Sequence, residues 1–328
     1  MSQSGSSSSS EDSADLRPVA PFQLDPDVVL YRGLRIVRYR KLRIKLARKK
    51  TNNQRFQSMF GVAPYTACVV FEDMMTTHIP EAKVEGSNLE LRDFLIALHF
   101  LRKYPKEDDY ERIFDMSKGW VRGIIWKYVK KIQALKAIKV VWPEDFAYLD
   151  LWVMTVDGTH CWIQELQEPN HPTWSQDSKY YSHKYNKAGM NFELGIALND
   201  NKLLWMNGPF KAGANDMKIF KDKGLSDELA RRGQKAIGDG GYSGRPGVVS
   251  TPNAYDNKGA KLFKSRALKR HENFNGMTKV FEILSGRFRH STTKFKCSFE
   301  AVCVLCQYKI ENETPLYDIL IQDVVDKM

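Results

Sequence analysis

Apolar residues recur at helical spacing along three consecutive segments in the first half of the chain. One apolar stripe covers residues 91–101 and stops before a proline, a second covers residues 110–114, and a third covers residues 121–132. Residues three and four apart share one face of a helix, so each stripe predicts an amphipathic helix. The short DMSKG turn joins the second helix to the third, which favours a helix-turn-helix within residues 87–141. A plain helical bundle is the alternative.

The apolar pattern changes after residue 145, where short runs of strand length replace the helical spacing. Strands are predicted at residues 151–156, 192–198, 203–206 and 235–238, with a hairpin turn at residues 199–202. Helices are predicted at residues 216–231, 258–287 and 299–310. This order predicts an α/β domain over residues 145–311, in which helices flank a mixed sheet, preceded by the all-α region.

The two ends of the chain differ in composition from the segments between them. Residues 1–27 are rich in serine, then acidic, then interrupted by prolines, and we expect them to be disordered. They contain no apolar stretch typical of a secretory signal, and no segment approaches the roughly 20 apolar residues of a membrane span. Residues 312–328 are expected to form a C-terminal tail. The five cysteines, an odd number, argue against a disulfide framework and favour a reducing, intracellular compartment.

Positive charge is concentrated in the basic N-terminal region, residues 28–86. The formal net charge of the chain is +11, and residues 28–71 contain eleven lysines and arginines but no aspartate or glutamate. Such a block repels itself unless water or a polyanion compensates its charge. We expect contacts with nucleic-acid phosphates, a nuclear-import signal, or both, with Arg40, Lys41 and Arg43 as central cations of the block. A solvated basic helix face is the alternative.

Contacts that distinguish one base from another are expected from the third helix of the helix-turn-helix. Lys118 and Arg122 lie near its start, which is the part of a recognition helix that reaches base edges. Truncating either side chain should therefore lower base selectivity more than neutralising the basic block does.

Three carboxylates from separate elements suggest a metal site. Asp157 and Asp239 each end an apolar run that is predicted to be a strand, and each is followed at once by glycine. Glu272 follows Asp239 by 33 positions in a predicted helix. Such carboxylates converge only if a cation offsets their repulsion, and hard oxygen ligands suit Mg²⁺ or Mn²⁺. On spacing alone, the two Asp-Gly pairs also fit ordinary turns.

Four ordered blocks of the chain resemble eukaryotic PIF/Harbinger-type transposases. They are VDGTH, GPFKAGANDMKIF, IGDGGYSG and HENFNGMTKVFEILSGRFRH, and the resemblance covers residues 145–310. A weaker resemblance extends to the predicted helix-turn-helix. These transposases belong to the DDE superfamily, so the resemblance implies an RNase H-like catalytic core that uses two divalent metal ions to cut DNA and transfer strands. The ordered set is specific, whereas any single block is weak.

The resemblance also implies roles for individual residues. Asp157 and Asp239 match the paired metal-binding aspartates of the family, and Glu272 matches the glutamate that completes the site. Asp216 matches a recurrent acid, which we expect to be a helix N-terminal charge or a neighbour of the ligands rather than a ligand. Lys279 matches a lysine that would hold a DNA phosphate near the metals.

Some positions depart from the family pattern or compete with it. Met277-Thr278 replaces the usual basic and aliphatic pair, which weakens the case for tight binding of strand ends, and Asn215 stands where many relatives have histidine. Glu282 is a rival for the third acid. On one continuous helix its side chain would lie about 80° away from that of Glu272, so both cannot face one metal, and Glu272 is preferred.

Other candidate ligands have simpler explanations. Cys297, Cys303 and Cys306 are predicted to be buried helix thiols, with a structural zinc site that includes His290 as the alternative. His160 follows Asp157 closely, and a contact with a substrate phosphate and a structural role both remain open.

The preferred interpretation is a metal-dependent DNA endonuclease and transposase that acts in the nucleus on transposon ends and target DNA. One alternative is a domesticated DNA-binding protein that kept the fold and lost the catalysis; another is an RNase H-like nuclease that does not transpose. Relatives often act with a separate Myb-like protein, so the resemblance implies such an accessory partner. Association of the chain with itself is left open.

Overall fold

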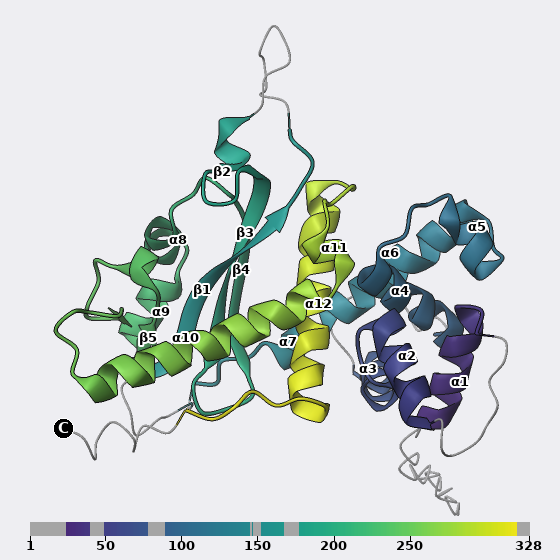
Figure 1. Ribbon diagram of the computed structural model, residues 1–328, viewed down its shortest axis with the longest axis horizontal. Coiled ribbons are helices and arrows are strands. Elements are labelled where there is room, and N and C mark those ends of the chain that lie inside the picture. Colours follow the sequence, from purple (N-terminus) through teal and green to yellow (C-terminus); the bar gives the residue numbers. More distant parts are fainter. Residues whose placement is uncertain are drawn as a thin grey trace, which may run out of the picture.

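A mixed β-sheet with helices on both faces lies beside a group of N-terminal helices (Figure 1). This computed structural model describes residues 24–39, 49–77, 89–144, 146, 152–166 and 177–319. The arrangement confirms the predicted α/β class with a preceding helical region, and it is consistent with an RNase H-like core.

The helices that precede the sheet include three at the predicted apolar stripes, residues 91–101, 110–114 and 121–132. In chain order, the helices are α1 (Pro26–Ile36), α2 (Lys49–Phe60), α3 (Pro64–Thr76), α4 (Leu91–Lys103), α5 (Asp109–Phe114), α6 (Lys118–Ala134) and α7 (Lys136–Lys139). The predicted stripes of α4 and α6 are buried, and α4 and α6 pack on each other. The three predicted helices, α4, α5 and α6, are therefore confirmed, whereas their action as a DNA-binding helix-turn-helix stays a prediction.

Six strands form the sheet within the described residues. They are β1 (Trp152–Trp162), β2 (Tyr181–Ser182), β3 (Lys187–Ala197), β4 (Leu203–Lys211), β5 (Lys235–Ile237) and β6 (Val249–Ser250). β3 pairs antiparallel with β1, β2 and β4, and the turn between β3 and β4 is the predicted hairpin. β5 pairs in parallel with β1 and β6.

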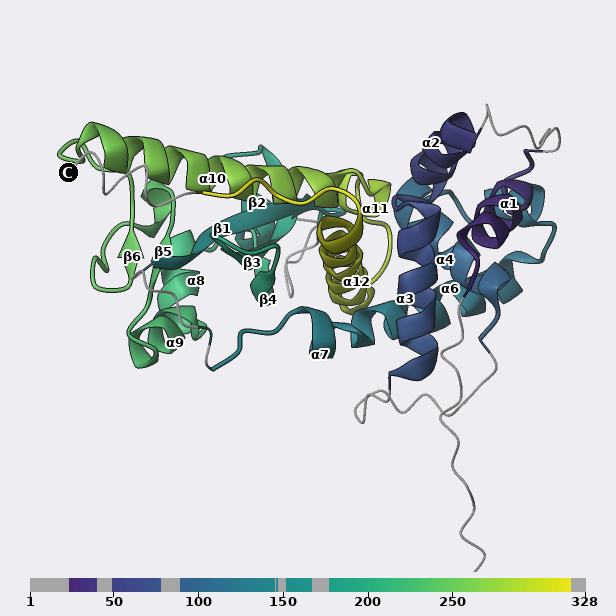
Figure 2. The ribbon, with the colours of Figure 1, turned by 90° about the horizontal axis from the view of Figure 1, so that it is seen from below.

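Helices cover the two faces of the sheet (Figure 2). On one face, α10 (Lys258–Lys279) crosses β1 and β5, and its Phe263 and Ala267 belong to one apolar cluster with Ile237 of β5. On the other face lie α8 (Asp216–Asp222) and α9 (Leu225–Arg231), whose apolar residues pack with Val153, Met154 and Val156 of β1. The long helix α10 thereby runs alongside the strand that carries Asp157.

Two segments predicted as single helices are each broken in the structure. Gly224 separates α8 from α9 because its φ of +101° lies in the left-handed region, where a helix ends and glycine is favoured. α10 ends at Lys279, and the short helix α11 (Glu282–Ser285) starts after Phe281. Phe281 leaves the helix to bury its ring against Gly61 of the N-terminal region, and its side chain is 1 % exposed.

The last helix, α12 (Thr292–Asn312), is longer than predicted and packs between the sheet and the N-terminal helices (Figure 1). Phe299 stacks on Phe192 of β3 with 3.6 Å between ring centres, and Tyr308 donates a hydrogen bond to Asp73 of α3 at 2.5 Å. One apolar core therefore joins the two regions, and the predicted domain boundaries stay predictions. Although α12 is apolar on both sides, no helix in the described ranges could cross a membrane.

Candidate active site

Asp157 and Asp239 lie where the pairing of two parallel strands stops. Thr155 of β1 pairs with Ile237 of β5, and each aspartate follows one member of this pair by two residues. Asp239 comes directly after the strand and one glycine, as predicted. The prediction that Asp157 ends its strand is wrong, because β3 stays paired with β1 as far as Trp162 after β5 has ended.

Both carboxylates are oriented by nearby hydrogen-bond donors. Asp157 accepts one bond from the backbone N–H of Gly158 at 2.8 Å and another from the side-chain amide of Asn275 at 3.2 Å. Asp239 accepts a bond from the backbone N–H of Gly241 at 2.8 Å, at the start of a 3₁₀ turn. Asn275 lies on α10, so this helix helps to hold Asp157 in place.

Asp216, at the start of α8, approaches the same place. A Cβ atom added to Gly158 would lie 3.0 Å from Oδ1 of Asp216, and one added to Gly241 would lie 3.2 Å from Oδ2. Burial raises the pKa of Asp157 to about 7, helped by the charges of Asp239 and Asp216. Burial and the charge of Asp239 also raise the pKa of Asp216. These three residues form what we call the aspartate cluster.

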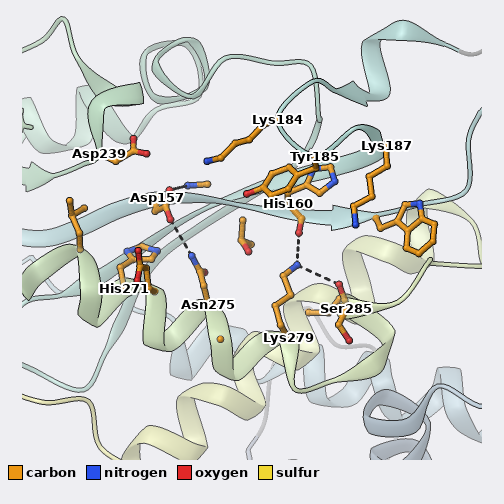
Figure 3. A pocket seen from close by; sticks show the side chains of 17 residues that line it. Asp157, His160, Lys184, Tyr185, Lys187, Asp239, His271, Asn275, Lys279 and Ser285 are labelled. Atoms are coloured by element: carbon orange, nitrogen blue, oxygen red, sulfur yellow. Dashed lines mark hydrogen bonds between the residues drawn. The ribbon is translucent and has the colours of Figure 1, made fainter. Parts of the chain in front are cut away.

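Lys184 supplies positive charge to the aspartate cluster. It lies in the turn between β2 and β3, and Figure 3 shows its side chain directed toward Asp157 and Asp239. Its pKa is raised, most strongly by Tyr185 and then by the three carboxylates of the cluster. The ammonium group therefore partly offsets the repulsion among the aspartates.

Asp157 and Asp239 line one cleft of about 550 Å³ between β1 and α10 (Figure 3). Glu272 lines the same cleft. Glu272 lies at the rim, where its side chain is 63 % exposed and accepts a hydrogen bond from Lys269 at 3.1 Å. Among the described residues, no three acids, histidines or cysteines are gathered closely enough to hold a metal ion. Metal binding by the three predicted acids thus stays a prediction.

Lys279 lines the same cleft but bonds within the protein. Its ammonium group donates to the backbone carbonyls of His160 and Leu284 and contacts the sulfur of Cys161 at 3.0 Å. These contacts tie the C-terminal end of α10 to β1 and α11. The contact with a DNA phosphate that the family pattern implies stays a prediction.

The cations predicted to contact bases are paired with acids near α5. Lys118 donates to Asp108 at 3.1 Å, and the guanidinium of Arg122 donates to both carboxylate oxygens of Glu107. All these side chains are at least one third exposed, so water can compete for each pair. The other predicted DNA contacts, Arg40, Lys41 and Arg43, lie outside the described residues.

Competing candidates lie away from the cleft. Glu282 belongs to α11 rather than α10, and it forms ion pairs with Arg102 and Lys103 of α4. As predicted, the three cysteines of the last helix are buried, and burial raises the pKa values of their thiols.

Several residues near the aspartate cluster were not predicted from the sequence. Glu193 pairs with Gly158 across the strands; burial raises its pKa to about 8, although Trp205 donates a hydrogen bond to it at 3.1 Å. Glu193 is an acidic residue inside the predicted strand 192–198, and this unusual position could have identified it as a candidate. Asn275 follows Glu272 by three residues on one helix face, but Lys184 lies in a turn that no periodicity marks.

Comparison with known proteins agrees with this geometry. Residues 156–307, just under half of the chain, match the family model for a DDE superfamily endonuclease. The matched range contains Asp157, Asp216, Asp239 and Glu272. Neither a curated protein nor a solved structure matches the chain. The family match supports a nuclease domain of the DDE transposase type over residues 156–307.

Proposed function

We propose that the chain is a PIF/Harbinger-type transposase that binds DNA, cleaves phosphodiester bonds and transfers strands in the nucleus. The observation that carries this proposal is the meeting of Asp157 and Asp239 in one cleft, within residues that match the DDE superfamily endonuclease family. Glu272 lines the same cleft from α10. The order of the four sequence blocks supports the PIF/Harbinger subtype.

The side chains of the cleft suit a hard divalent cation. Carboxylate oxygens are the ligands that Mg²⁺ and Mn²⁺ prefer. Burial raises the pKa of Asp157, and so do the charges of Asp239 and Asp216, which a cation would compensate. Asp157 and Asp239 would hold the metal, and Glu272 would reach it from the rim once it releases Lys269. When bound, divalent ions activate water or a 3′-hydroxyl and stabilise the departing oxygen.

Residues around the acids would position the DNA. Asn275 holds the carboxylate of Asp157 by its hydrogen bond, which limits rotation of that side chain. The ammonium group of Lys184 is attracted by the charges of the three aspartates while these are uncompensated. Once a cation compensates that charge, the ammonium group is available to a phosphate of the strand in the cleft.

Binding of DNA outside the cleft would be divided between two surfaces. The basic block around Arg40, Lys41 and Arg43 would contact phosphates, whereas Lys118 and Arg122 would reach bases after leaving their acidic partners. Neutralising the three cations of the block should reduce the slope of log K against log salt concentration by up to about 2 to 3. It should change the preference between DNA sequences little. A Myb-like accessory protein and self-association are further parts of this proposal.

A DNA-binding protein without catalysis is the second candidate. The observation that favours it is the position of Glu272, which pairs with Lys269 at the rim instead of joining the aspartates. In this case the chain would bind DNA, and the acids would bind no catalytic metal.

Incubation of the purified chain with DNA separates these functions. The substrate is a candidate inverted repeat taken from the DNA that flanks the coding region, in buffer with Mg²⁺ or Mn²⁺. Strand transfer supports the transposase, and hydrolysis alone indicates a nuclease that does not transpose. Binding without cleavage would overturn the enzymatic proposal in favour of the second candidate.

A further inference from the structure

An aromatic platform lies in the cleft beside the aspartate cluster. The ring of His160 is packed against Gly189 so closely that a Cβ atom there would lie 2.0 Å from Cε1 of the imidazole. Nδ1 of His160 lies 3.1 Å from the side-chain oxygen of Asn191. His160 also stacks on Tyr185, with 4.5 Å between ring centres and 19° between ring planes (Figure 3). The close contact with Gly189 and the hydrogen bond to Asn191 thus hold the His160 ring on which Tyr185 stacks.

Tyr185 belongs to a tight turn between β2 and β3. Asn186, the next residue, has a φ of +51° in the left-handed region, which asparagine adopts more readily than most residues. Tyr185 remains 45 % exposed and lines the cleft. A large aromatic ring that is fixed from below and open to a charged cleft is a surface on which a planar ligand can stack.

Cations accompany the aromatic rings along β1. Trp162 follows His160 by two residues, so both side chains lie on the same face of the strand. Lys187 and Arg287 lie 5.0 Å and 5.9 Å from the centre of the Trp162 ring, and neither has an acidic partner among the residues that the structure describes. Lys184 lies 5.6 Å from the centre of the Tyr185 ring. Aromatic rings interleaved with cations are typical of surfaces that bind single-stranded nucleic acid.

The platform lies a few nucleotides from the acids. His160 follows Asp157 by three positions, which corresponds to about 10 Å along a β-strand. One strand of a DNA duplex advances about 3.4 Å per nucleotide, so the platform is roughly three nucleotides from the aspartate cluster. A base inside a duplex has both faces covered by its neighbours, so only an unpaired or terminal base can stack on Tyr185.

Building on the proposed function, we infer that the cleft binds an unpaired DNA nucleotide close to the cleaved bond, with its base stacked on Tyr185. Its neighbouring phosphates contact Lys187 and Arg287. The substrate near the cut is therefore a locally opened strand rather than an intact duplex.

Fluorescence of 2-aminopurine tests this inference without cleavage. The probe is a twelve-nucleotide oligothymidylate with one central 2-aminopurine, bound by the full chain in calcium buffer. Wild type and Tyr185→Phe should quench the probe by stacking, whereas Tyr185→Ala should lose the quenching and bind roughly 5- to 150-fold more weakly. Tyr255→Ala is the matched control, because Tyr255 is 96 % exposed and does not line the cleft. It should behave as the wild type.

A second probe, with an abasic site in place of 2-aminopurine, tests whether the affinity lost in Tyr185→Ala depends on the base. Wild type and Tyr185→Ala should bind this probe equally. The inference is wrong if Tyr185→Ala retains both the affinity and the quenching of the wild type. If the wild type cleaves DNA in Mn²⁺ and Tyr185→Ala shows no change, only the inference fails. If no cleavage occurs but the stacking effect is present, the inference stands and the proposed nuclease fails.

Discussion

Asp157 and Asp239 stand at the same offset from one pair of parallel strand residues, because each follows by two positions a member of the Thr155–Ile237 pair. Backbone pairing of β1 with β5 therefore sets the relation between the two carboxylates. Burial raises the pKa of Asp157, and the nearby charges of Asp239 and Asp216 raise it further.

Removing the charge of Lys184 should destabilise the protein when no divalent cation is present. Lys184→Met keeps the length of the side chain but leaves the aspartate cluster without its ammonium group. We expect a lower melting temperature in EDTA and a larger rise on addition of Mn²⁺ than in the wild type. Lys221→Met, at an exposed position of α8 outside the cleft, is the control. Equal Mn²⁺ shifts in wild type and Lys184→Met would contradict the role of Lys184.

Glu193 should make the protein less stable as the pH rises. Its pKa is about 8 in the folded state and 4.5 as the ordinary value, so the folded state binds the extra proton between these pH values. Stability contributed by the protonated form is present below about pH 4.5 and is lost as the pH rises through about 8. As the pH rises across this window, the free energy of unfolding of Glu193→Gln should increase relative to that of the wild type by on the order of 4 kcal/mol.

Urea denaturation at several pH values measures this effect. Asp157 contributes a slope of the same sign to both proteins, so the difference between wild type and Glu193→Gln isolates Glu193. A difference that stays constant from pH 4.5 to pH 8 would show that Glu193 is charged in the folded protein.

Lys279 should contribute to folding as well as to the cleft. Lys279→Met would leave the carbonyls of His160 and Leu284 without their side-chain donor, at a cost of about 1–3 kcal/mol. Urea denaturation should detect this loss, and Lys269→Met on an exposed face of α10 should show little change. Unchanged stability together with weaker DNA binding would indicate that Lys279 acts mainly on DNA.

Glu107 should restrain the interaction of Arg122 with DNA. Glu107→Gln removes the charge that holds the guanidinium, and affinity for duplex DNA should rise. If Arg122 then contacts a phosphate, the slope of log K against log salt should steepen by about 0.9. Glu111→Gln, an exposed acid on α5, is the control. An increase in affinity that is equal in both variants would point to net charge alone.

Local patterns in the sequence predicted the elements that depend on local contacts. The stripe from Val121 to Ile132 matches the buried face of α6, and the hairpin between β3 and β4 forms around its predicted turn. The length of β1 was not predicted, because its second half depends on pairing with β3. The end of α10 was also missed, because Phe281 is drawn from the helix by burial against Gly61 in a distant part of the chain.

The candidate site was also predicted only in part, because some of its residues meet through contacts between distant segments of the chain. Asp157, Asp239 and Glu272 stood in ordered blocks that resemble a known family, so their positions could be inferred. The approach of Asp216 and Lys184 to the cluster depends on how α8 and the turn before β3 meet the sheet. Spacing along the chain carries no information on these contacts.

Cleavage of DNA by aspartate variants tests the central claim most directly. Wild type, Asp157→Asn, Asp239→Asn and the control Glu282→Gln are compared on one DNA substrate in Mn²⁺, with binding measured in parallel. Asparagine keeps the shape of the side chain but loses the charge that holds a cation. We expect both aspartate variants to bind DNA as the wild type does and to cleave at background level, while Glu282→Gln cleaves normally. Cleavage by either aspartate variant at more than a small fraction of the wild-type rate, or no cleavage by the wild type itself, would contradict the account.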